Sequence, residues 1–206
     1  MRTGRGTASG IGSDRVKAVV TQAGPVSSGK GITFSGGNYR IENLKEKDRR
    51  ILGRTRDLEF LRYAISYVRD AAEMARYRAF VGTYAYLIAK LERQPAVDEA
   101  HAIAASADEL WLCRGDLGSE LGMPAMAEVV HGFFGSMHNE ATPVLLAGQV
   151  LEHMSAAPAA TRAEVCNLYD ILARGYTGVV LSDETAIGQY PVEACRTAAM
   201  FREISF

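Results

Sequence analysis

Charged side chains follow several apolar stretches of this 206-residue chain, at positions where they could do metal-assisted chemistry. Lys90 and Glu92 close the stretch "LIAKLE", and Arg114 and Asp116 close "LWLCRGD". Carboxylate oxygens suit Mg²⁺ and Mn²⁺, so Glu92 and Asp116 are candidate ligands of one divalent cation. Lys90 shares its side of an extended segment with Glu92 and could polarise a substrate oxygen, and Arg114 is a second candidate catalytic cation.

Each of these residues also has a structural interpretation. Glu92 could be an acidic residue at a helix start, and Asp116 a helix cap or turn residue. Lys90 could lay its apolar stem along the strand and hold its ammonium in water. Gly115 and Gly118 could serve only a tight turn, or they could expose backbone amides that bind a carboxylate or phosphate together with Asp116.

Two further segments carry candidate polar groups. In "ATRAE", Thr161 and Glu164 have the spacing of a helix capping box, which leaves Arg162 for an anion or an intersubunit contact. The segment "SDETAIGQYP", residues 182–191, is either an oxygen-rich loop or another helix cap, so Ser182 and Glu184 are candidates for an anion or interface contact.

The elements that must position these residues alternate along the chain. The sequence predicts helices in the charged stretch from residue 44 and over 69–80, 95–107, 123–140, 161–175 and 190–204, and strands within 63–68, 83–92, 109–116, 142–152 and 176–185. Such alternation predicts an α/β fold with a parallel sheet, here about five βα units of a (β/α) TIM-type barrel. Active sites of such barrels assemble at the carboxyl ends of the strands, where the polar residues recur.

The N-terminal stretches show little regular pattern, and the composition argues against nucleic acid, zinc and membrane as partners. Residues 1–13 carry four glycines and no hydrophobic period, so we expect them to be loose; residues 15–22 and 31–34 suggest short extended segments. A net charge of −1 gives no case for nucleic acid, and the three cysteines lack zinc spacing. With no apolar leader and no run of about 20 apolar residues, we expect a cytoplasmic protein without membrane contact.

Five motifs resemble the pyruvate kinase family in that family's order: "LIAKLE", "CRGDLGSELG", "PVLLAGQVLEHM", "ATRAE" and "LSDETAIGQYPVEACR". The resemblance is strong from about Leu87 to Arg196. It implies that Lys90 stabilises a transferring phosphoryl group and the developing enolate, and that Glu92 and Asp116 bind Mg²⁺ or Mn²⁺. It also implies that the Gly115 and Asp116 amides hold the substrate carboxylate; Gly148 and Gln149, on the following strand end, complete the substrate-binding set.

The chain also departs from the family's pattern. Gly148 stands where the family has a threonine that serves proton handling at the enolate carbon. Asp183 and Ile187 replace a glycine and a lysine, and Cys166–Asn167 replaces a serine–aspartate pair. The first barrel strands and the regulatory domain have no counterpart, and the lid domain is reduced to a short stretch. We therefore expect poor phosphoryl transfer.

These observations lead to three alternative functions. The first is a repurposed, metal-dependent enzyme acting on a 2-oxo acid or other enolisable small molecule, as a lyase, decarboxylase, isomerase or cyclase. The second is residual pyruvate kinase activity, phosphoenolpyruvate plus ADP to pyruvate plus ATP, and the third is a non-catalytic binding or scaffold protein.

We expect residues 1–30 to be a segment with a vestige of the lid connection and residues 31–206 to be the partial barrel. Because five strands cannot close a barrel, we also expect a homodimer or higher homo-oligomer.

Overall fold

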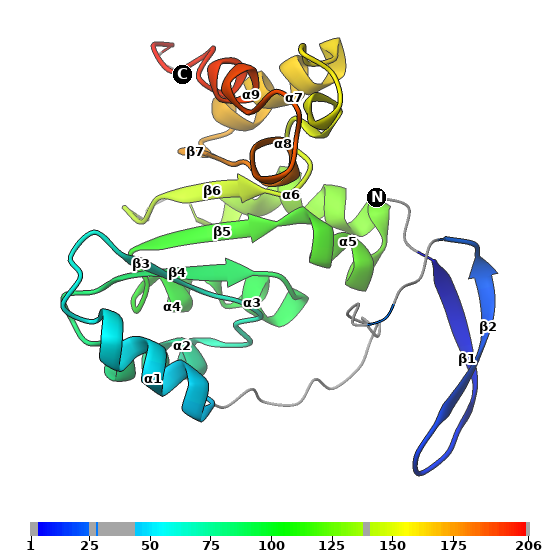
Figure 1. The fold of residues 1–206 in the computed structure, drawn as a ribbon, viewed down its shortest axis with the longest axis vertical. Helices are drawn as coiled ribbons and strands as arrows, with labels where there is room; N and C mark the ends of the chain where they lie inside the picture. The colour runs from blue at the N-terminus through cyan, green and yellow to red at the C-terminus, as the bar shows by residue number, and fades with distance from the viewer. Residues whose placement is uncertain (1–3, 25–27, 29–43, 138–140, 205–206) are drawn as a thin grey trace. The chain divides into compact units, whose positions relative to one another are not determined.

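A five-stranded parallel sheet lies at the centre of the larger unit (Figure 1), and Lys90 is on one of its strands. The computed structural model describes residues 4–24, 28, 44–137 and 141–204, which belong to two units, one within residues 1–34 and the other within 35–206. The sheet lies in the second unit, in the order β3-β4-β5-β6-β7. Its strands are β3 (Arg62–Ile65), β4 (Tyr86–Leu91), β5 (Glu109–Cys113), β6 (Val144–Ala147) and β7 (Gly178–Val180). The predicted incomplete barrel of five parallel strands is therefore confirmed.

Helices lie between successive strands, as parallel pairing requires, and further helices precede β3 and follow β7. They are α1 (Glu46–Thr55), α2 (Ala71–Val81), α3 (Gln94–Asp98), α4 (Ala100–Ala104), α5 (Arg114–Leu121), α6 (Met123–Ser136), α7 (Arg162–Ala173), α8 (Asp183–Ala186), α9 (Pro191–Ala198) and the 3₁₀ helix η1 (Glu152–Ser155). The predicted capping box is present, because Thr161 Oγ1 accepts from the Glu164 amide and the Glu164 carboxylate accepts from the Thr161 amide. Gly175, with φ +105°, follows the end of α7 as expected.

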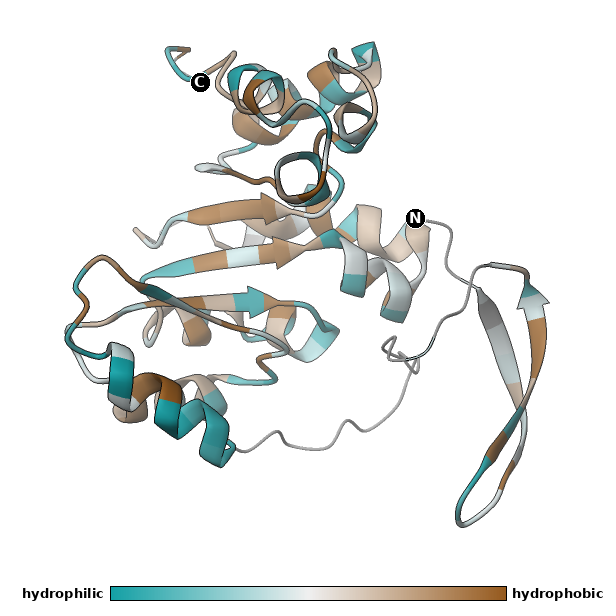
Figure 2. Ribbon diagram, viewed as in Figure 1, coloured by the Kyte–Doolittle hydropathy of each residue, from teal (hydrophilic) through white to brown (hydrophobic). Residues whose placement is uncertain are grey.

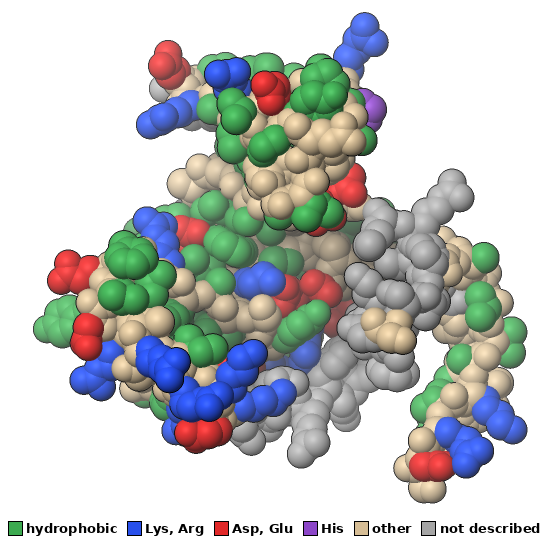
Figure 3. Space-filling model, viewed as in Figure 1, with side chains coloured by type: hydrophobic (Ala, Val, Ile, Leu, Met, Phe, Trp, Pro, Cys, Tyr) green, Lys and Arg blue, Asp and Glu red, His purple; other side chains and the backbone are tan. Residues whose placement is uncertain are grey.

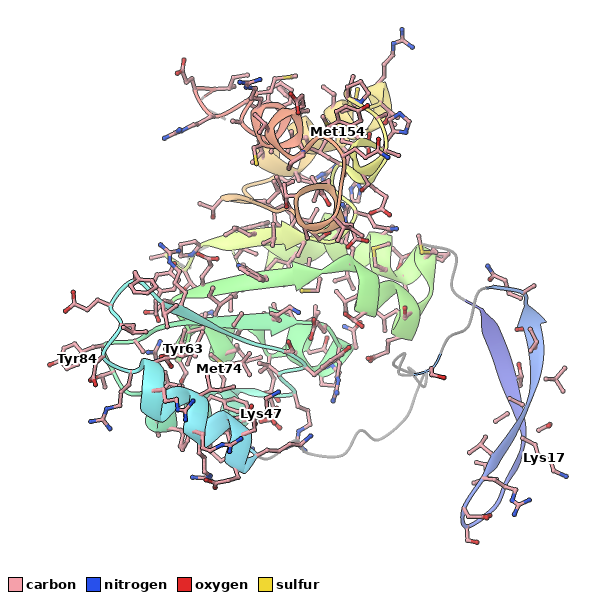
Figure 4. All side chains as sticks on the ribbon, in the orientation of Figure 1. Lys17, Lys47, Tyr63, Met74, Tyr84 and Met154 are labelled. Carbon is pink, nitrogen blue, oxygen red and sulfur yellow. The ribbon has the colours of Figure 1, made fainter. Side chains whose placement is uncertain are left out.

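The core lies between the sheet and its connecting helices. Alternate residues of β4, Leu87, Ala89 and Leu91, are fully buried, and the apolar strands stand out in the hydropathy view (Figure 2). They belong to one cluster with apolar side chains of α2, α4, α6 and α7. Met74 of α2 and Met154 of η1 are also fully buried (Figure 4). The intervening residues of β4, including Lys90, therefore face the opposite side of the sheet.

Three local predictions differ from the structure. Residues expected to be loose form strand β1 (Arg5–Ile11). Their backbone hydrogen bonds go to β2 (Val16–Gln22), which confirms the extended segment expected over 15–22. The expected helix over 95–107 is divided into α3 and α4 at Glu99, whose carboxylate accepts from the Ala71 amide at 2.9 Å. The "CRGDLG" turn is itself the start of a separate helix, α5. The expected extended segment at 31–34 lies outside the described residues.

Among the helices of the described residues, none combines the length and the apolar character that crossing a membrane demands.

Candidate functional site

Lys90 and Glu92 form the centre of the candidate site. Lys90 Nζ lies 2.6 Å from Glu92 Oε1 and 3.4 Å from Ser66 Oγ. Glu92 is only 2% exposed, so its carboxylate is held in a largely dry position. Burial works against the charge of Lys90, but the hydrogen bond and the attraction of Glu92 outweigh it and raise the Lys90 pKa. The ammonium therefore stays charged beside the carboxylate.

Tyr67 joins Glu92 to Asp116, although the two carboxylates follow different strands. Its backbone N–H donates to Glu92 Oε2 at 2.6 Å, and its phenol O–H donates to Asp116 Oδ1 at 3.1 Å. Burial and the charge of Asp116 raise the pKa of Tyr67 to about 12, so the phenol remains a donor at neutral pH. Figure 3 shows acidic and basic side chains gathered beside apolar ones over the sheet. The structure thus brings Lys90, Glu92 and Asp116 together at the carboxyl ends of β4 and β5.

The start of α5 and the turn after β6 form the second part of the site. Arg114, Gly115 and Asp116 occupy the first turn of α5, where backbone N–H groups have no partner within the helix. Gly148 has φ +90°, and a Cβ atom there would lie 3.3 Å from the Gly115 nitrogen. The glycine therefore keeps space open in front of an amide that could bind an anion.

Arg114 holds this turn in place. Its guanidinium donates to the carbonyl oxygens of Gly148 at 2.9 Å and Gln149 at 3.0 Å, and to Asn167 Oδ1 at 3.0 Å. Burial lowers the Arg114 pKa. Gln149 is exposed and has φ +53°, an uncommon value for a residue other than glycine. The arginine expected to be catalytic therefore connects β5 to the β6 turn and to α7.

The other predicted residues lie on later elements. Arg162 is exposed at the first position of α7, and Ser182 is exposed at the start of α8. Glu184 is fully buried and accepts from the Leu151 amide at 3.3 Å and from the Ser182 amide at 3.1 Å. Its carboxylate therefore connects the end of β7 with the segment after β6.

The donor set of the site suits a hard divalent cation. Glu92 and Asp116 offer carboxylate oxygens, and no group of three or more histidine, cysteine, aspartate or glutamate side chains is arranged for a metal within the described ranges. Mg²⁺ is usually held by one or two carboxylates and completes its coordination with water and substrate oxygens. Two carboxylates therefore suit a cation that is also bound by a substrate better than one whose ligands all come from the protein.

The sequence did not predict the contacts of three residues at the site. Ser66 and Tyr67 directly follow β3, so their place at a strand end was the available signal, but a serine and a tyrosine are common in such loops. Asn167 contacts Arg114 across 53 positions of the chain, which no local pattern reveals. Cys113, 6% exposed, also adjoins the site: burial and the nearby Glu92 charge raise its pKa to about 12.

Comparison with known proteins gives a consistent result. The family model described as pyruvate kinase, barrel domain, matches residues 8–195. The chain is 36% identical over 191 residues to a pyruvate kinase of Mycobacterium intracellulare and 35% identical over 184 residues to one of Agrobacterium vitis. It is 32% identical over 187 residues to pyruvate kinase isozyme G, chloroplastic, of Ricinus communis. These matches cover 91%, 89% and 89% of this chain but 40%, 39% and 45% of the relatives, so the chain spans less than half of their length.

Proposed function

Because the chain belongs to the pyruvate kinase family, we propose that it binds Mg²⁺ or Mn²⁺ through Glu92 and Asp116 and acts on a 2-oxo acid or a related enolisable substrate. The observation that carries this proposal is the meeting of Lys90, Glu92 and Asp116 at the ends of two adjacent parallel strands. Charged groups at that edge of the sheet are arranged as an active site of a barrel enzyme would need them.

Each group has a distinct task in this proposal. Glu92 and Asp116 would hold the cation, which supplies Lewis-acid withdrawal of charge from a substrate oxygen when it is bound. The Lys90 ammonium offers a fixed positive charge for an oxygen that becomes negative during the reaction. The amides of Gly115 and Asp116 at the start of α5 would bind the substrate carboxylate.

The turn after β6 supports the choice of reaction type in this proposal. Gly148 supplies no hydroxyl, and its missing Cβ leaves the α5 amides accessible. Carbon–carbon bond cleavage, decarboxylation, isomerisation or cyclisation at an enolate requires the cation and Lys90 but no nucleotide site. Phosphoryl transfer from phosphoenolpyruvate to ADP is the second candidate, supported by 36% identity to a relative named pyruvate kinase.

Metal titration tests the proposal. We expect the wild-type chain to bind Mn²⁺ and the variants Glu92→Gln and Asp116→Asn, which keep the side-chain size, to bind it at least tenfold more weakly. Glu193→Gln on α9 is the control for loss of one carboxylate and should bind as the wild type does. Wild-type protein that binds neither Mn²⁺ nor Mg²⁺ would refute the enzyme proposal and favour a non-catalytic binding protein. Pyruvate formation from phosphoenolpyruvate and ADP would favour the second candidate.

The chain also forms a homo-oligomer in our proposal. β3 and β7 end the sheet, and among the described residues neither has a strand paired on its outer side. Unpaired strand edges and exposed apolar side chains such as Phe60, 79% exposed just before β3, favour association. Light scattering after size-exclusion chromatography should give at least twice the monomer mass; a monomer at all concentrations would overturn this part.

A further inference from the structure

Tyr67 contacts both carboxylates of the candidate cation site through two different groups. Its backbone N–H binds Glu92 and its phenol O–H binds Asp116, with donor–acceptor distances of 2.6 Å and 3.1 Å. Glu92 and Asp116 are 24 positions apart and follow β4 and β5, whereas Tyr67 follows β3. A single residue from a third strand end therefore contacts both carboxylates.

Tyr67 has an unusual backbone conformation, and its ring, although 44% exposed, lies against a guanidinium. Its φ of +58° lies in the left-handed region, which residues other than glycine seldom adopt. The Arg93 guanidinium lies 5.1 Å from the centre of its ring, on the segment that also carries Glu92. Unfavourable backbone conformations persist where the surrounding contacts impose them, and they concentrate at functional sites. In this backbone conformation Tyr67 directs its N–H to Glu92 and its hydroxyl to Asp116.

We propose that Tyr67 is a positioning residue of the cation site and that its hydroxyl orients the Asp116 carboxylate for metal binding. The inference rests on the proposed function, because Glu92 and Asp116 must be the cation ligands. Groups that hydrogen-bond to a ligating side chain fix its orientation, and their removal typically weakens metal affinity by about 10- to 100-fold. The remaining oxygen positions of Asp116 stay available for the cation.

The test compares Tyr67→Phe with the wild-type chain in Mn²⁺ titrations followed by electron paramagnetic resonance of the free ion. Tyr67→Phe removes only the hydroxyl and keeps the backbone bond to Glu92, so we expect Mn²⁺ affinity to fall about tenfold or more. Tyr63→Phe is the matched control: this residue lies on β3, and its hydroxyl shares a 2.9 Å hydrogen bond with Thr55 of α1 (Figure 4). The control should bind Mn²⁺ as the wild type does.

A second readout uses the tyrosine absorbance of the folded wild-type protein. Mn²⁺ binding to Asp116 should change the surroundings of the Tyr67 phenol and give a tyrosine difference spectrum. We expect that signal to persist in Tyr63→Phe and to disappear in Tyr67→Phe. A wild-type chain that binds Mn²⁺ without any tyrosine signal would overturn the role of Tyr67, whether or not the variant folds.

The outcomes separate the two proposals. Equal Mn²⁺ affinity of the wild type and a folded Tyr67→Phe variant overturns the positioning role and leaves the cation site itself intact. No Mn²⁺ binding by the wild type overturns both. Weaker binding in Tyr67→Phe alone, together with an unchanged melting temperature, supports the positioning role over a general effect on folding.

Discussion

Gly148→Ala is the sharpest stability test of the turn that follows β6. Gly148 has φ +90°, and a Cβ atom would lie 3.3 Å from the Gly115 nitrogen and 3.7 Å from the Arg114 nitrogen. A residue other than glycine in such a conformation costs about 1–3 kcal/mol of folding free energy. The close contact is with backbone atoms of α5, which cannot move away as the end of a flexible side chain can. We therefore expect the unfolding free energy to fall by about 2 kcal/mol. For a chain of this size that corresponds to a melting temperature about 4–8 °C lower.

Thermal unfolding followed by circular dichroism measures this change. The control is Gly132→Ala, at an exposed site inside α6 where an added Cβ meets nothing within 4 Å. Alanine there should stabilise the helix by up to about 1 kcal/mol. If Gly148→Ala melted at the wild-type temperature or above it, the argument that positive φ and the close approach to α5 require glycine would be wrong.

Three further predictions concern other parts of the site and its supports. Cys113 should react with a thiol reagent at pH 8 far more slowly than the other two cysteines, which are exposed, so a time course should show two fast thiols; three equally fast thiols would contradict its burial. Arg114→Lys should lower the urea-unfolding free energy by about 2 kcal/mol, because lysine cannot reproduce the planar set of bonds to the β6 turn and Asn167; an unchanged midpoint would show that these bonds add nothing. Burial alone would raise the Glu164 pKa, but hydrogen bonds from amides including that of Thr161 lower this pKa below its ordinary value of 4.5. The ionised carboxylate therefore stabilises the fold above pH 4.5, and this stabilisation is lost as the pH falls through the lowered pKa. Glu164→Ala should therefore cost about 1 kcal/mol at pH 7 and much less at pH 2 in thermal melts, and a pH-independent cost would count against this account.

Much of the fold could be predicted from the sequence because its signals are local. Apolar runs of strand length alternate with helical periods, and this alternation predicted five parallel strands and their order along the chain. The capping box at Thr161 and the stop at Gly175 were predictable for the same reason, since each depends on residues within one or two helical turns. Strand β2 was expected, but β1 and its pairing with β2 were missed because the glycine-rich composition of residues 1–13 shows no strand pattern.

The candidate site was predictable only in part. The sequence by itself placed Lys90, Glu92 and Asp116 at strand ends, because polar residues there interrupt apolar runs and parallel strands bring their carboxyl ends to one edge. Only the tertiary structure decided that Tyr67 joins the two carboxylates, that Arg114 holds the turn at Gly148, and that this glycine has positive φ. These features depend on contacts between residues far apart in the chain and on backbone angles imposed by packing, which residue types and spacing do not encode locally.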